Sequence, residues 1–537
     1  MHLKASAPVT SAGRDGGDIV RPRAPSDPLT TLVIAAACLI HGALAYYQLS
    51  RPDMLFGVTG IDDGAYFGTA VRLVHGIIPY HQFVAVHPPG MALLLSPIAA
   101  LSDAIGTRDG MALCRLLLPL VGMADVALVG LIVRHRGRLA TLVACAVFAL
   151  QPDVLVTEHT IELEPVLVLF CLLGAHVVFR GDEMADGRRL VWGGVLFGLA
   201  GAVKVWAVFP VAVLAVLCIA VAPRRLVRFG AGVVGGFLVP CAFFIAVDPG
   251  AFFHDVVVAQ VGRVGGARVP VSSRLVDLAG IRGLGPLARY PVEVSVVLAA
   301  MVAAAFLLRR RRIPTLEWFA LGSTVLLVVV FVLPQQFFSH YATFFAPFLA
   351  LTLGLAVDRL VRSADLTAPL FAVVTVLALG LAVGDQGYIS IGGGVNVKPP
   401  FALTLVDAVV PAGACVLADN PSIPIMADRF VPRSPGCTPV ADPFGTSIAE
   451  GTGAPIGNGS AVPPHLVQVW LDALHHADYV VLDGPAFAGL RIPLVAPVTS
   501  YLDDAFQLVV RKPGQYSGLL IYARIGYPTG APHVAGS

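Results

Sequence analysis

The chain has 537 residues, of which 56% are hydrophobic and only 13% are charged, and its mean hydropathy is +0.80. Soluble globular proteins carry about 25% charged residues, so this composition excludes a soluble enzyme and indicates a protein that crosses the membrane many times. The net charge of +2 gives no indication of a nucleic-acid partner.

The chain begins with a polar segment that is rich in proline, glycine and serine. Residues 1–28 are too poor in apolar side chains to fold, so we expect a disordered cytoplasmic tail. Apolar runs long enough to span a bilayer then recur through residues 29–384 and predict about eleven transmembrane helices. The runs lie at 29–49, 111–133, 139–157, 165–179, 190–204, 205–222, 229–247, 291–308, 315–334, 342–357 and 367–384.

Arginine clusters occur in every second loop between these runs, for example at 134–138 and 309–312. Short loops rich in arginine stay in the cytoplasm, so the pattern predicts a multi-pass protein of the plasma (inner) membrane. The N-terminus should be cytoplasmic and the C-terminal segment extracytoplasmic. Two outer loops are long, 50–110 and 248–290. The second is rich in arginine, either because long loops escape the charge rule or because some of these side chains bind a phosphate.

From residue 385 to residue 537 the composition becomes that of a soluble protein. Short β-rich runs such as 479–482 and 506–510 alternate with helical stretches, which predicts an extracytoplasmic α/β domain. Cys415 and Cys437 are the two cysteines of this segment. On the oxidising side of the membrane, we expect a disulfide between them.

An acidic pair, Asp62-Asp63, follows the first apolar run. Asp62 suits the N-cap of a short amphipathic helix, whose apolar face, including Tyr66, would lie in lipid. Both aspartates could simply cap and solvate this helix. Because one would suffice for capping, the second could instead accept a proton from an acceptor hydroxyl as a general base. Further along the loop, His87 either faces the same site or orients the Pro88-Pro89 turn.

A second acidic group lies at the outer end of a later span and contains Glu158, His159, Glu162 and Glu164. Three glutamates within seven residues are expensive to bury at a membrane surface, so they should face a polar cavity. The alternative is a solvated surface turn. If this stretch is helical, Glu158 and Glu162 share a face.

Lys204 is the one lysine inside an apolar stretch, which suggests a functional cation paired with a carboxylate or a phosphate. It could otherwise extend its ammonium group to the outer surface. His340 and Tyr341 reach the same outer face and could donate hydrogen bonds to a phosphate, or could form an interfacial aromatic anchor.

The order and sidedness of these motifs across residues 50–350 resemble the GT-C superfamily of integral membrane glycosyltransferases. The similarity is to bacterial relatives of protein O-mannosyltransferases and of the lipid A aminoarabinose transferase, which are family 39-like. This resemblance implies inverting transfer of a sugar from a polyprenyl-phosphate donor to an acceptor hydroxyl of a cell-envelope glycan, lipid or protein. It gives the role of base to Asp62, with Asp63 standing where many members have glutamate.

The predicted site therefore combines the groups introduced above. The expected catalytic residues are Asp62, Asp63, Glu158 and Glu164, and the expected substrate-binding residues are Tyr66, His87, His159, Glu162, Lys204, Arg263, His340 and Tyr341. No metal ligand is assigned, since the paired acids could act alone or hold a divalent ion. The expected partners are the lipid-linked donor, the envelope acceptor and membrane lipids, without nucleic acid.

Two other classes of protein would also need many helices. One is a lipid or glycolipid transporter or flippase, and the other is an inactive scaffold whose outer domain binds cell-wall polymers. Against the transporter, no internal repeat with paired broken helices is evident, and the acids gather on one side of the membrane instead of at its midplane.

Overall fold

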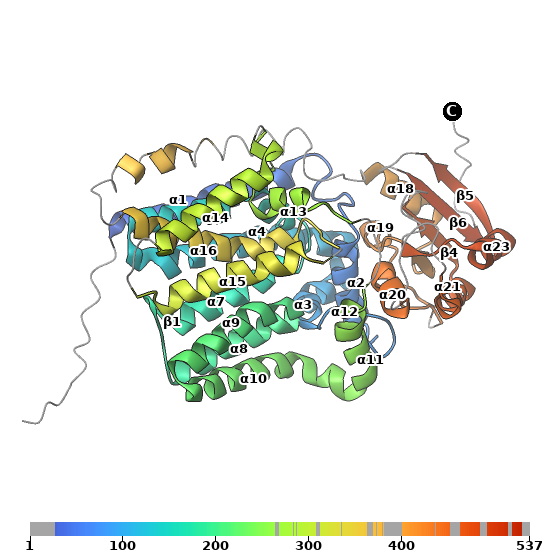
Figure 1. Cartoon of the computed structure of the whole chain (residues 1–537). Coiled ribbons are helices and arrows are strands. Elements are labelled where there is room, and N and C mark those ends of the chain that lie inside the picture. Colours follow the sequence, from blue (N-terminus) through green and yellow to red (C-terminus); the bar gives the residue numbers. More distant parts are fainter. Residues whose placement is uncertain are drawn as a thin grey trace, which may run out of the picture.

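The structure is a computed structural model that combines a long helical bundle with a smaller part built around a β-sheet (Figure 1). It describes residues 27–528 apart from 264–267, 283, 286, 308–311, 335, 362–368, 372, 378–379, 381–399, 435, 452–461, 484–490 and 514–517. Residues 1–26 of the predicted tail at 1–28, and half of the predicted span at 367–384, lie outside the described residues.

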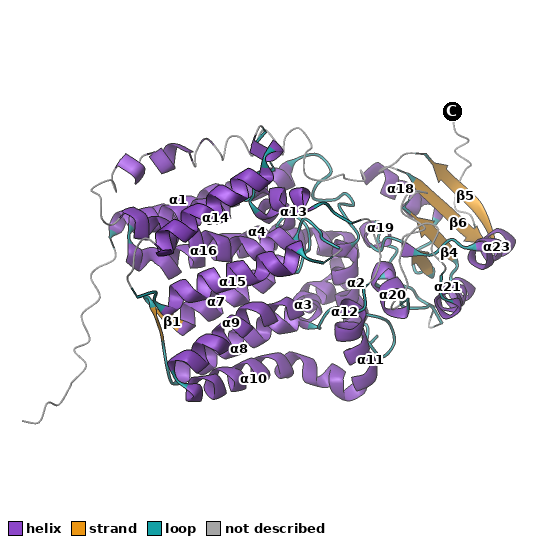
Figure 2. Cartoon of the chain, in the orientation of Figure 1, coloured by secondary structure: helices purple, strands orange, loops and turns teal. Residues whose placement is uncertain are grey.

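The bundle consists of long helices that lie side by side along one axis, together with shorter helices (Figures 1 and 2). They are α1 (Pro28–Ser50), α2 (Asp62–Val74), α3 (Gly90–Ile105), α4 (Thr107–Val133), α5 (Arg138–Ala149), α6 (Pro152–Thr157), α7 (Glu164–Val178), α8 (Arg188–Val203), α9 (Val208–Val221), α10 (Pro223–Val247), α11 (Pro249–Phe253), α12 (Ala259–Val261), α13 (Val271–Leu278), α14 (Pro291–Leu307), α15 (Thr315–Val332) and α16 (Tyr341–Val361), with a π-helix at His254–Val258 and a hairpin of β1 (Phe179–Arg180) and β2 (Glu183–Met184).

Within the described residues, five helices are long and apolar enough to cross a membrane, namely α1, α4 with its following turn, α10, α15 and α16. Five shorter apolar helices accompany them, and one of these is α3, which lies inside the predicted outer loop 50–110. The multi-pass helical architecture is thus as predicted, while the number of spans stays an expectation. The single span expected at 139–157 is two helices, α5 and α6, because Pro152 holds the preceding Gln151 in an extended conformation.

Small residues let two of the bundle's helices approach closely. Gly194 and Gly198 of α8 face Gly232 and Gly236 of α10, and a Cβ atom at Gly198 would lie 2.2 Å from the carbonyl oxygen of Val233. Pairs of small residues four apart allow such backbone contact between membrane helices, where the hydrophobic effect does not drive helix association.

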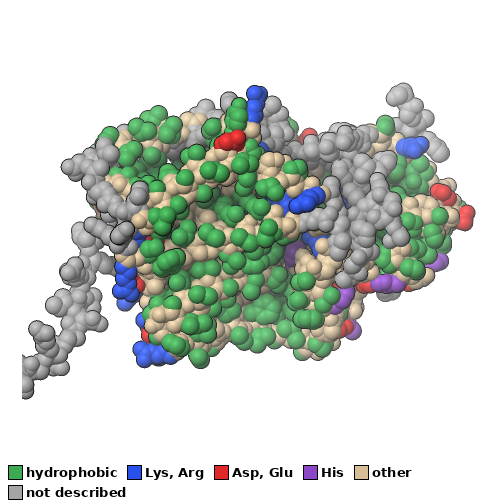
Figure 3. Space-filling model, in the orientation of Figure 1, with side chains coloured by type: hydrophobic (Ala, Val, Ile, Leu, Met, Phe, Trp, Pro, Cys, Tyr) green, Lys and Arg blue, Asp and Glu red, His purple; other side chains and the backbone are tan. Residues whose placement is uncertain are grey.

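Loops from different parts of the sequence meet at the end of the bundle away from the sheet, which we call the arginine-rich end. Here Arg136 binds Asp182 (2.7 Å), Glu317 (2.6 Å) and Asp358 (3.0 Å), and Arg359 binds Glu317 (2.6 Å). Blue side chains appear at this left-hand end in Figure 3, and hydrophobic side chains cover most of the visible face between the two ends. The arginine-bearing loops therefore share one side of the bundle.

Helix α2 is placed differently from the sequence prediction. It does not present its apolar face to lipid, because Phe67 and Ala70 are fully buried and a Cβ atom at Gly64 would lie 2.2 Å from the backbone nitrogen of Ser422. Nor is Asp62 an N-cap. The helix begins at Asp62 itself, Ile61 is the cap residue, and no side chain caps the helix. The polar C-terminal region covers α2, and its surface replaces the lipid that we expected.

The C-terminal region contains the strands β3 (Val416–Ala418), β4 (Tyr479–Leu482), β5 (Phe506–Lys512) and β6 (Leu519–Arg524) in the order β3-β4-β6-β5. Strands β3 and β4 are parallel, and the other neighbours are antiparallel. The accompanying helices are α18 (Pro400–Val409), α19 (Ser422–Met426), α20 (Pro443–Glu450), α21 (Pro464–His476) and α23 (Ala496–Ala505).

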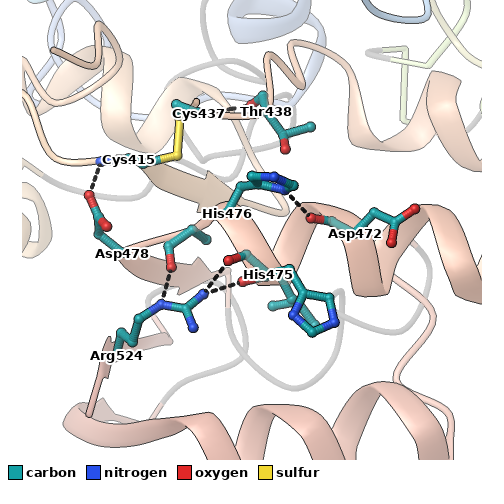
Figure 4. The surroundings of a disulfide bond; sticks show 10 residues. Cys415, Cys437, Thr438, Asp472, His475, His476, Asp478 and Arg524 are labelled. Atoms are coloured by element: carbon teal, nitrogen blue, oxygen red, sulfur yellow. Dashed lines mark hydrogen bonds between the residues drawn. A yellow bond between two sulfur atoms is a disulfide. The ribbon is translucent and has the colours of Figure 1, made fainter. Parts of the chain in front are cut away.

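The predicted disulfide between Cys415 and Cys437 is present (Figure 4). Asp478 accepts a hydrogen bond from the Cys415 backbone nitrogen at 2.8 Å. Arg524 donates to the carbonyl oxygens of Leu474 (2.6 Å) and His475 (2.9 Å) at the end of α21. These contacts attach Cys415, the residue before β3, and the end of α21 to the sheet.

Hydrogen bonds join the two parts of the molecule directly. The Ser422 hydroxyl accepts from the Gly64 backbone nitrogen (2.9 Å) and donates to the Gly60 carbonyl (2.8 Å). Thr107, at the start of α4, donates to the Ile425 carbonyl at 2.7 Å. Helix α19 is thereby held against α2 and α4, which brings the C-terminal region onto the acidic loop.

Candidate active site

The two adjacent aspartates occupy different environments. The carboxylate of Asp63 is buried, pairs with the buried Arg115 of α4, and accepts hydrogen bonds from the Thr59 hydroxyl (2.5 Å) and the Ile161 backbone nitrogen. Arg115 also donates to three carbonyls of residues 54–57 at 2.8–3.1 Å. Asp63 and Arg115 together fix the outer loop against the segment that carries the second acidic group.

Asp62 is only partly buried. Its carboxylate lies 3.5 Å from the Tyr66 hydroxyl, one turn along α2, and no described cation lies within ion-pair distance of it. The Tyr66 hydroxyl is surrounded by carboxylates. Burial raises its pKa well above the usual value, and the charges of Asp62, Glu162, Glu164 and Asp442 raise it further.

Glu162 lies in the same group of acids. Its Oε2 atom is buried without a described hydrogen-bond partner. Burial raises the pKa of Glu162 well above its usual value, and the charges of Asp62 and Glu164 add to this effect, whereas Lys204 opposes it. Burial and the neighbouring carboxylates thus favour the protonated form of Glu162.

A cationic group faces these acids. The Lys204 ammonium lies 2.5 Å from Glu164 Oε1 and 3.8 Å from the ring centre of Trp206. His340 Nε2 lies 3.9 Å from the same Glu164 oxygen, and Tyr341 packs edge-on against Trp206 with ring centres 4.2 Å apart. The lysine is held by its pairing with Glu164 and does not extend freely to solvent. Oε2 of Glu164 is buried without a described partner.

Arg263 completes the cationic group. Its guanidinium lies 5.1 Å from the ring centre of Phe338 and 5.0 Å from that of Phe444, and its Nε atom is buried without a described hydrogen-bond partner. Burial lowers the pKa of His340, the charges of Lys204 and Arg263 lower it further, and Glu164 and Asp62 oppose this. The imidazole of His340 thus lies within reach of both the acidic and the cationic groups.

His87 lines a small cavity. Tyr66, His87 and Leu163 line it together with Asp442 of the C-terminal region, and its volume is about 30 Å³. Burial lowers the pKa of His87 well below its usual value, and the nearby cations lower it further, so the ring is neutral and can donate or accept a hydrogen bond. Its Nδ1 atom is buried without a described partner.

The structure does not bring Glu158 into this group. Its carboxylate lies 2.5 Å from Nε2 of His41 in α1, and a Cβ atom at Gly122 would lie 2.1 Å from its oxygens. His159 also points elsewhere, because its Nδ1 atom contacts the Leu155 carbonyl at 3.1 Å. Burial lowers the pKa of His159 to about 4.

Asp442 is one of two residues of the site that sequence reasoning missed. The Asp442-Pro443 pair is a helix-start signal, with an N-cap followed by proline at the first helical position. That signal says nothing about which cavity the carboxylate reaches, because Asp442 is far in sequence from the other site residues. Arg115 was missed for the same reason, since it lies in an apolar run without an acid beside it in sequence.

Metal binding was left open by the sequence. Among the residues described in the structure, no group of three or more histidine, cysteine, aspartate or glutamate side chains is arranged to hold a metal ion.

Comparisons with known proteins find one protein family and several solved structures that are similar to this chain. Residues 85–334 match the model of glycosyltransferase family 87, while the sequence resemblance pointed to family 39-like relatives. No curated protein sequence matches the chain at a significant level. Among solved structures, the chain is similar to apo ArnT from Cupriavidus metallidurans, with 14% identity, a TM-score of 0.57, and coverage of 92% of this chain and 97% of that chain.

Two further solved structures are similar along most of this chain. ArnT from Cupriavidus metallidurans bound to undecaprenyl phosphate is 15% identical, with a TM-score of 0.54 and coverage of 94% of this chain and 99% of that chain. The Archaeoglobus fulgidus oligosaccharyltransferase tethered with an acceptor peptide is 14% identical, with a TM-score of 0.53 and coverage of 92% and 74%. The fold is that of the GT-C superfamily, as predicted.

Proposed function

We propose that this membrane glycosyltransferase of the GT-C superfamily moves a sugar from a polyprenyl-phosphate donor to a hydroxyl of an extracytoplasmic acceptor, with Asp62 as the general base. One observation carries the proposal. The charges of Asp62, Lys204 and Arg263 all act on the imidazole of His340, so the Asp62 carboxylate, which has no described ion-pair partner, lies near the two cations. The family match favours an enzyme over a transporter or an inactive scaffold.

The donor class is supported by what similar proteins bind. ArnT from Cupriavidus metallidurans has been solved with undecaprenyl phosphate. The Archaeoglobus fulgidus oligosaccharyltransferase AglB has been solved with a dolichol phosphate, at 14% identity, a TM-score of 0.53, and coverage of 90% of this chain and 73% of that chain. In this chain, Lys204, Arg263 and His340 are the groups suited to such a lipid phosphate.

The two aspartates divide the work in this proposal. Asp63 is a positioning residue, because Arg115, Thr59 and the Ile161 nitrogen already occupy its oxygens. Asp62 has oxygens left to accept a proton and lies one residue away on the same rigid helix. A general base must lie within hydrogen-bond reach of the proton that it takes, and the pairing of Asp63 holds the start of α2 in place for this.

The transfer is an inverting displacement. Asp62 takes the proton of the acceptor hydroxyl, whose oxygen forms a bond to the anomeric carbon of the donor sugar. The bond from that carbon to the phosphate oxygen breaks, and its electron pair stays with the polyprenyl phosphate. Lys204 and Arg263 stabilise the charge that develops on the leaving phosphate, and a protonated Glu162 can donate a hydrogen bond to the donor.

The test uses the full chain in lipid nanodiscs with a panel of synthetic polyprenyl-phosphate hexoses and pentoses. We expect release of free polyprenyl phosphate, and a decrease of about 10²–10⁴-fold in Asp62→Asn, the typical contribution of general-base catalysis. Asp103→Asn is the matched control, because Asp103 is an exposed aspartate of α3 that pairs with His75, the residue after α2. Full turnover by Asp62→Asn, or movement of intact donor across the bilayer without cleavage, would overturn the proposal.

A further inference from the structure

A larger cavity lies at the arginine-rich end of the bundle, away from the candidate active site. Its volume is about 810 Å³, within the range of about 300–1,000 Å³ that is typical of ligand sites. Residues from the start of α1, the turn after α4, the end of α7, the β1 hairpin and the start of α8 line it, and β1 marks this end in Figure 1. The lining includes five basic side chains, namely Arg134, His135, His176, Arg180 and Arg189.

Two of these arginines carry charge that the described residues do not balance. Arg134 and Arg180 are exposed, and no described carboxylate lies within ion-pair distance of either. Asp182, two residues after Arg180, is shared between His135 (2.6 Å) and Arg136 (2.7 Å). Glu183 lies opposite Arg180 in the hairpin, but no ion pair joins these two described residues. The cavity therefore differs from the fully paired network around Arg136.

Asp27 is the one acidic residue among the described residues that line the cavity, and it serves as a helix cap. Its carboxylate accepts hydrogen bonds from the Leu29 backbone nitrogen (3.1 Å) and from the Thr30 hydroxyl (3.4 Å) at the start of α1. Arg189 is held at the wall by a hydrogen bond from its Nε atom to the Val177 carbonyl at 3.2 Å. Positive charge thus exceeds negative charge around the cavity, and an anionic ligand relieves the repulsion between the cations.

The surroundings of the cavity favour an anion that carries apolar tails. Leu131 and Phe179 contribute apolar side chains to the wall. Thr31 lines the cavity at the start of α1, and the exposed face of this helix continues from it through Ala35 to Leu39, which is 67% exposed. Residues four apart share one face of a helix. Because α1 is apolar and long enough to cross a membrane, this face offers a path for lipid tails that begins at the cavity.

We propose that this cavity binds the anionic head group of a membrane phospholipid, with Arg134 and Arg180 as the donors to its phosphate. A guanidinium forms paired hydrogen bonds with a phosphate and stays charged at physiological pH. Basic pockets between membrane helices are suited to anionic lipid head groups. Because the cavity lies at the opposite end of the bundle from Asp62 and Lys204, it is separate from the proposed donor site, and the inference does not depend on the proposed function.

The test measures lipid binding by the full chain in phosphatidylcholine nanodiscs that contain increasing fractions of phosphatidylglycerol or cardiolipin. Native mass spectrometry counts the lipids that the released protein retains. We expect preferential retention of the anionic lipid, weakened about 30-fold in Arg134→Gln/Arg180→Gln, which is about fivefold for each basic residue near an anionic head group. Arg134→Lys/Arg180→Lys keeps the charges but loses the paired geometry, so its binding should lie between those of the wild-type protein and the glutamine variant.

The matched control is Arg224→Gln/Arg312→Gln, which makes the same change of charge at exposed arginines that do not line the cavity. Its lipid binding should stay close to that of the wild-type protein. Equal retention of phosphatidylcholine and anionic lipid, or equal weakening in the two glutamine variants, would overturn the inference, because the attraction would then come from the general charge of this end.

Two further measurements separate a lipid from a soluble anion and from a folding defect. Inorganic phosphate and ATP are added in separate samples at constant ionic strength. Retention of the lipid supports the inference, whereas its displacement would assign the cavity to a soluble phosphate compound and overturn it. Anionic lipid should raise the thermal unfolding midpoint of the wild-type protein and of the control, as a ligand of the folded state does. A rise of the same size in Arg134→Gln/Arg180→Gln would count against the inference.

Discussion

The two ends of the helical bundle differ in how completely their buried polar and charged groups are paired. At the arginine-rich end, Arg136 meets three carboxylates at 2.6–3.0 Å, and Glu317 is shared with Arg359. At the site end, polar atoms of Glu162, Arg263 and His87 are buried without described partners. Satisfied networks stabilise a fold, whereas unsatisfied buried groups are costly and mark places where a ligand supplies the missing partner. The difference supports the proposed placement of the active site.

The largest expected effect separates the two aspartates of the acidic pair. Asp62→Asn should lower turnover by about 10²–10⁴-fold without lowering the thermal unfolding midpoint. Asp63→Asn should destabilise the protein by about 3–5 kcal/mol, because it leaves Arg115 as an unpaired buried charge. Differential scanning fluorimetry beside the donor-release assay checks both, and equal stability of the two variants would contradict the division of roles.

At the opposite end, the expected effect is on stability alone. Arg136→Gln leaves Asp182, Glu317 and Asp358 with one partner fewer, so we expect a loss of about 3 kcal/mol with unchanged turnover per folded molecule. Thermal unfolding and a donor-release assay normalised to folded protein test this. A variant that folds normally but loses activity would show that the arginine-rich end also contributes to the reaction.

Removal of a cation from the cationic side of the site should lower turnover. Lys204→Gln removes a cation from the proposed phosphate side and should lower kcat by about 10²-fold, as loss of one transition-state charge stabiliser does. Lys398→Gln is a control for the substitution itself, at a lysine outside the described residues. If only the donor KM changes, Lys204 binds the donor equally in the ground and transition states.

The smallest expected effect concerns pH. The pKa of Asp442 is raised to about 6, mainly by burial, so its ionised form is disfavoured in the folded state relative to the unfolded state. The folded protein therefore loses stability as the pH rises from about 4, near the unfolded pKa, to about 6, and the loss is complete above pH 6. Asp442→Asn should raise stability at pH 7 by about 1 kcal/mol, after allowance for solvent screening, and should flatten the dependence of stability on pH between about pH 4 and 6. Unfolding midpoints of the wild-type protein and of Asp442→Asn across this pH range test the prediction. Asp62 and Arg263 are the charged neighbours that act on Asp442.

Part of the site could be predicted from sequence because its residues lie in short motifs. Asp62, Glu162, Glu164 and Lys204 stand out as charges beside apolar runs, and the structure brings them together. The same logic also selected Glu158, which lies four residues from Glu162 but turns inward to His41. Spacing along a helix could not reveal this, because the α6 helix ends at Thr157 and the chain changes direction before α7.

The sequence by itself determined the membrane class, the type of fold, the disulfide and the gathering of acids at one end of the bundle, because hydropathy, charge bias and local motifs are properties of short segments. Only the tertiary structure decided that Asp63 is paired with Arg115, that α2 lies under the C-terminal region and not in lipid, and that Asp442 enters the cavity. Each of these depends on contacts between residues far apart in sequence. Such contacts are selected by packing and charge compensation in three dimensions, and no local pattern records them.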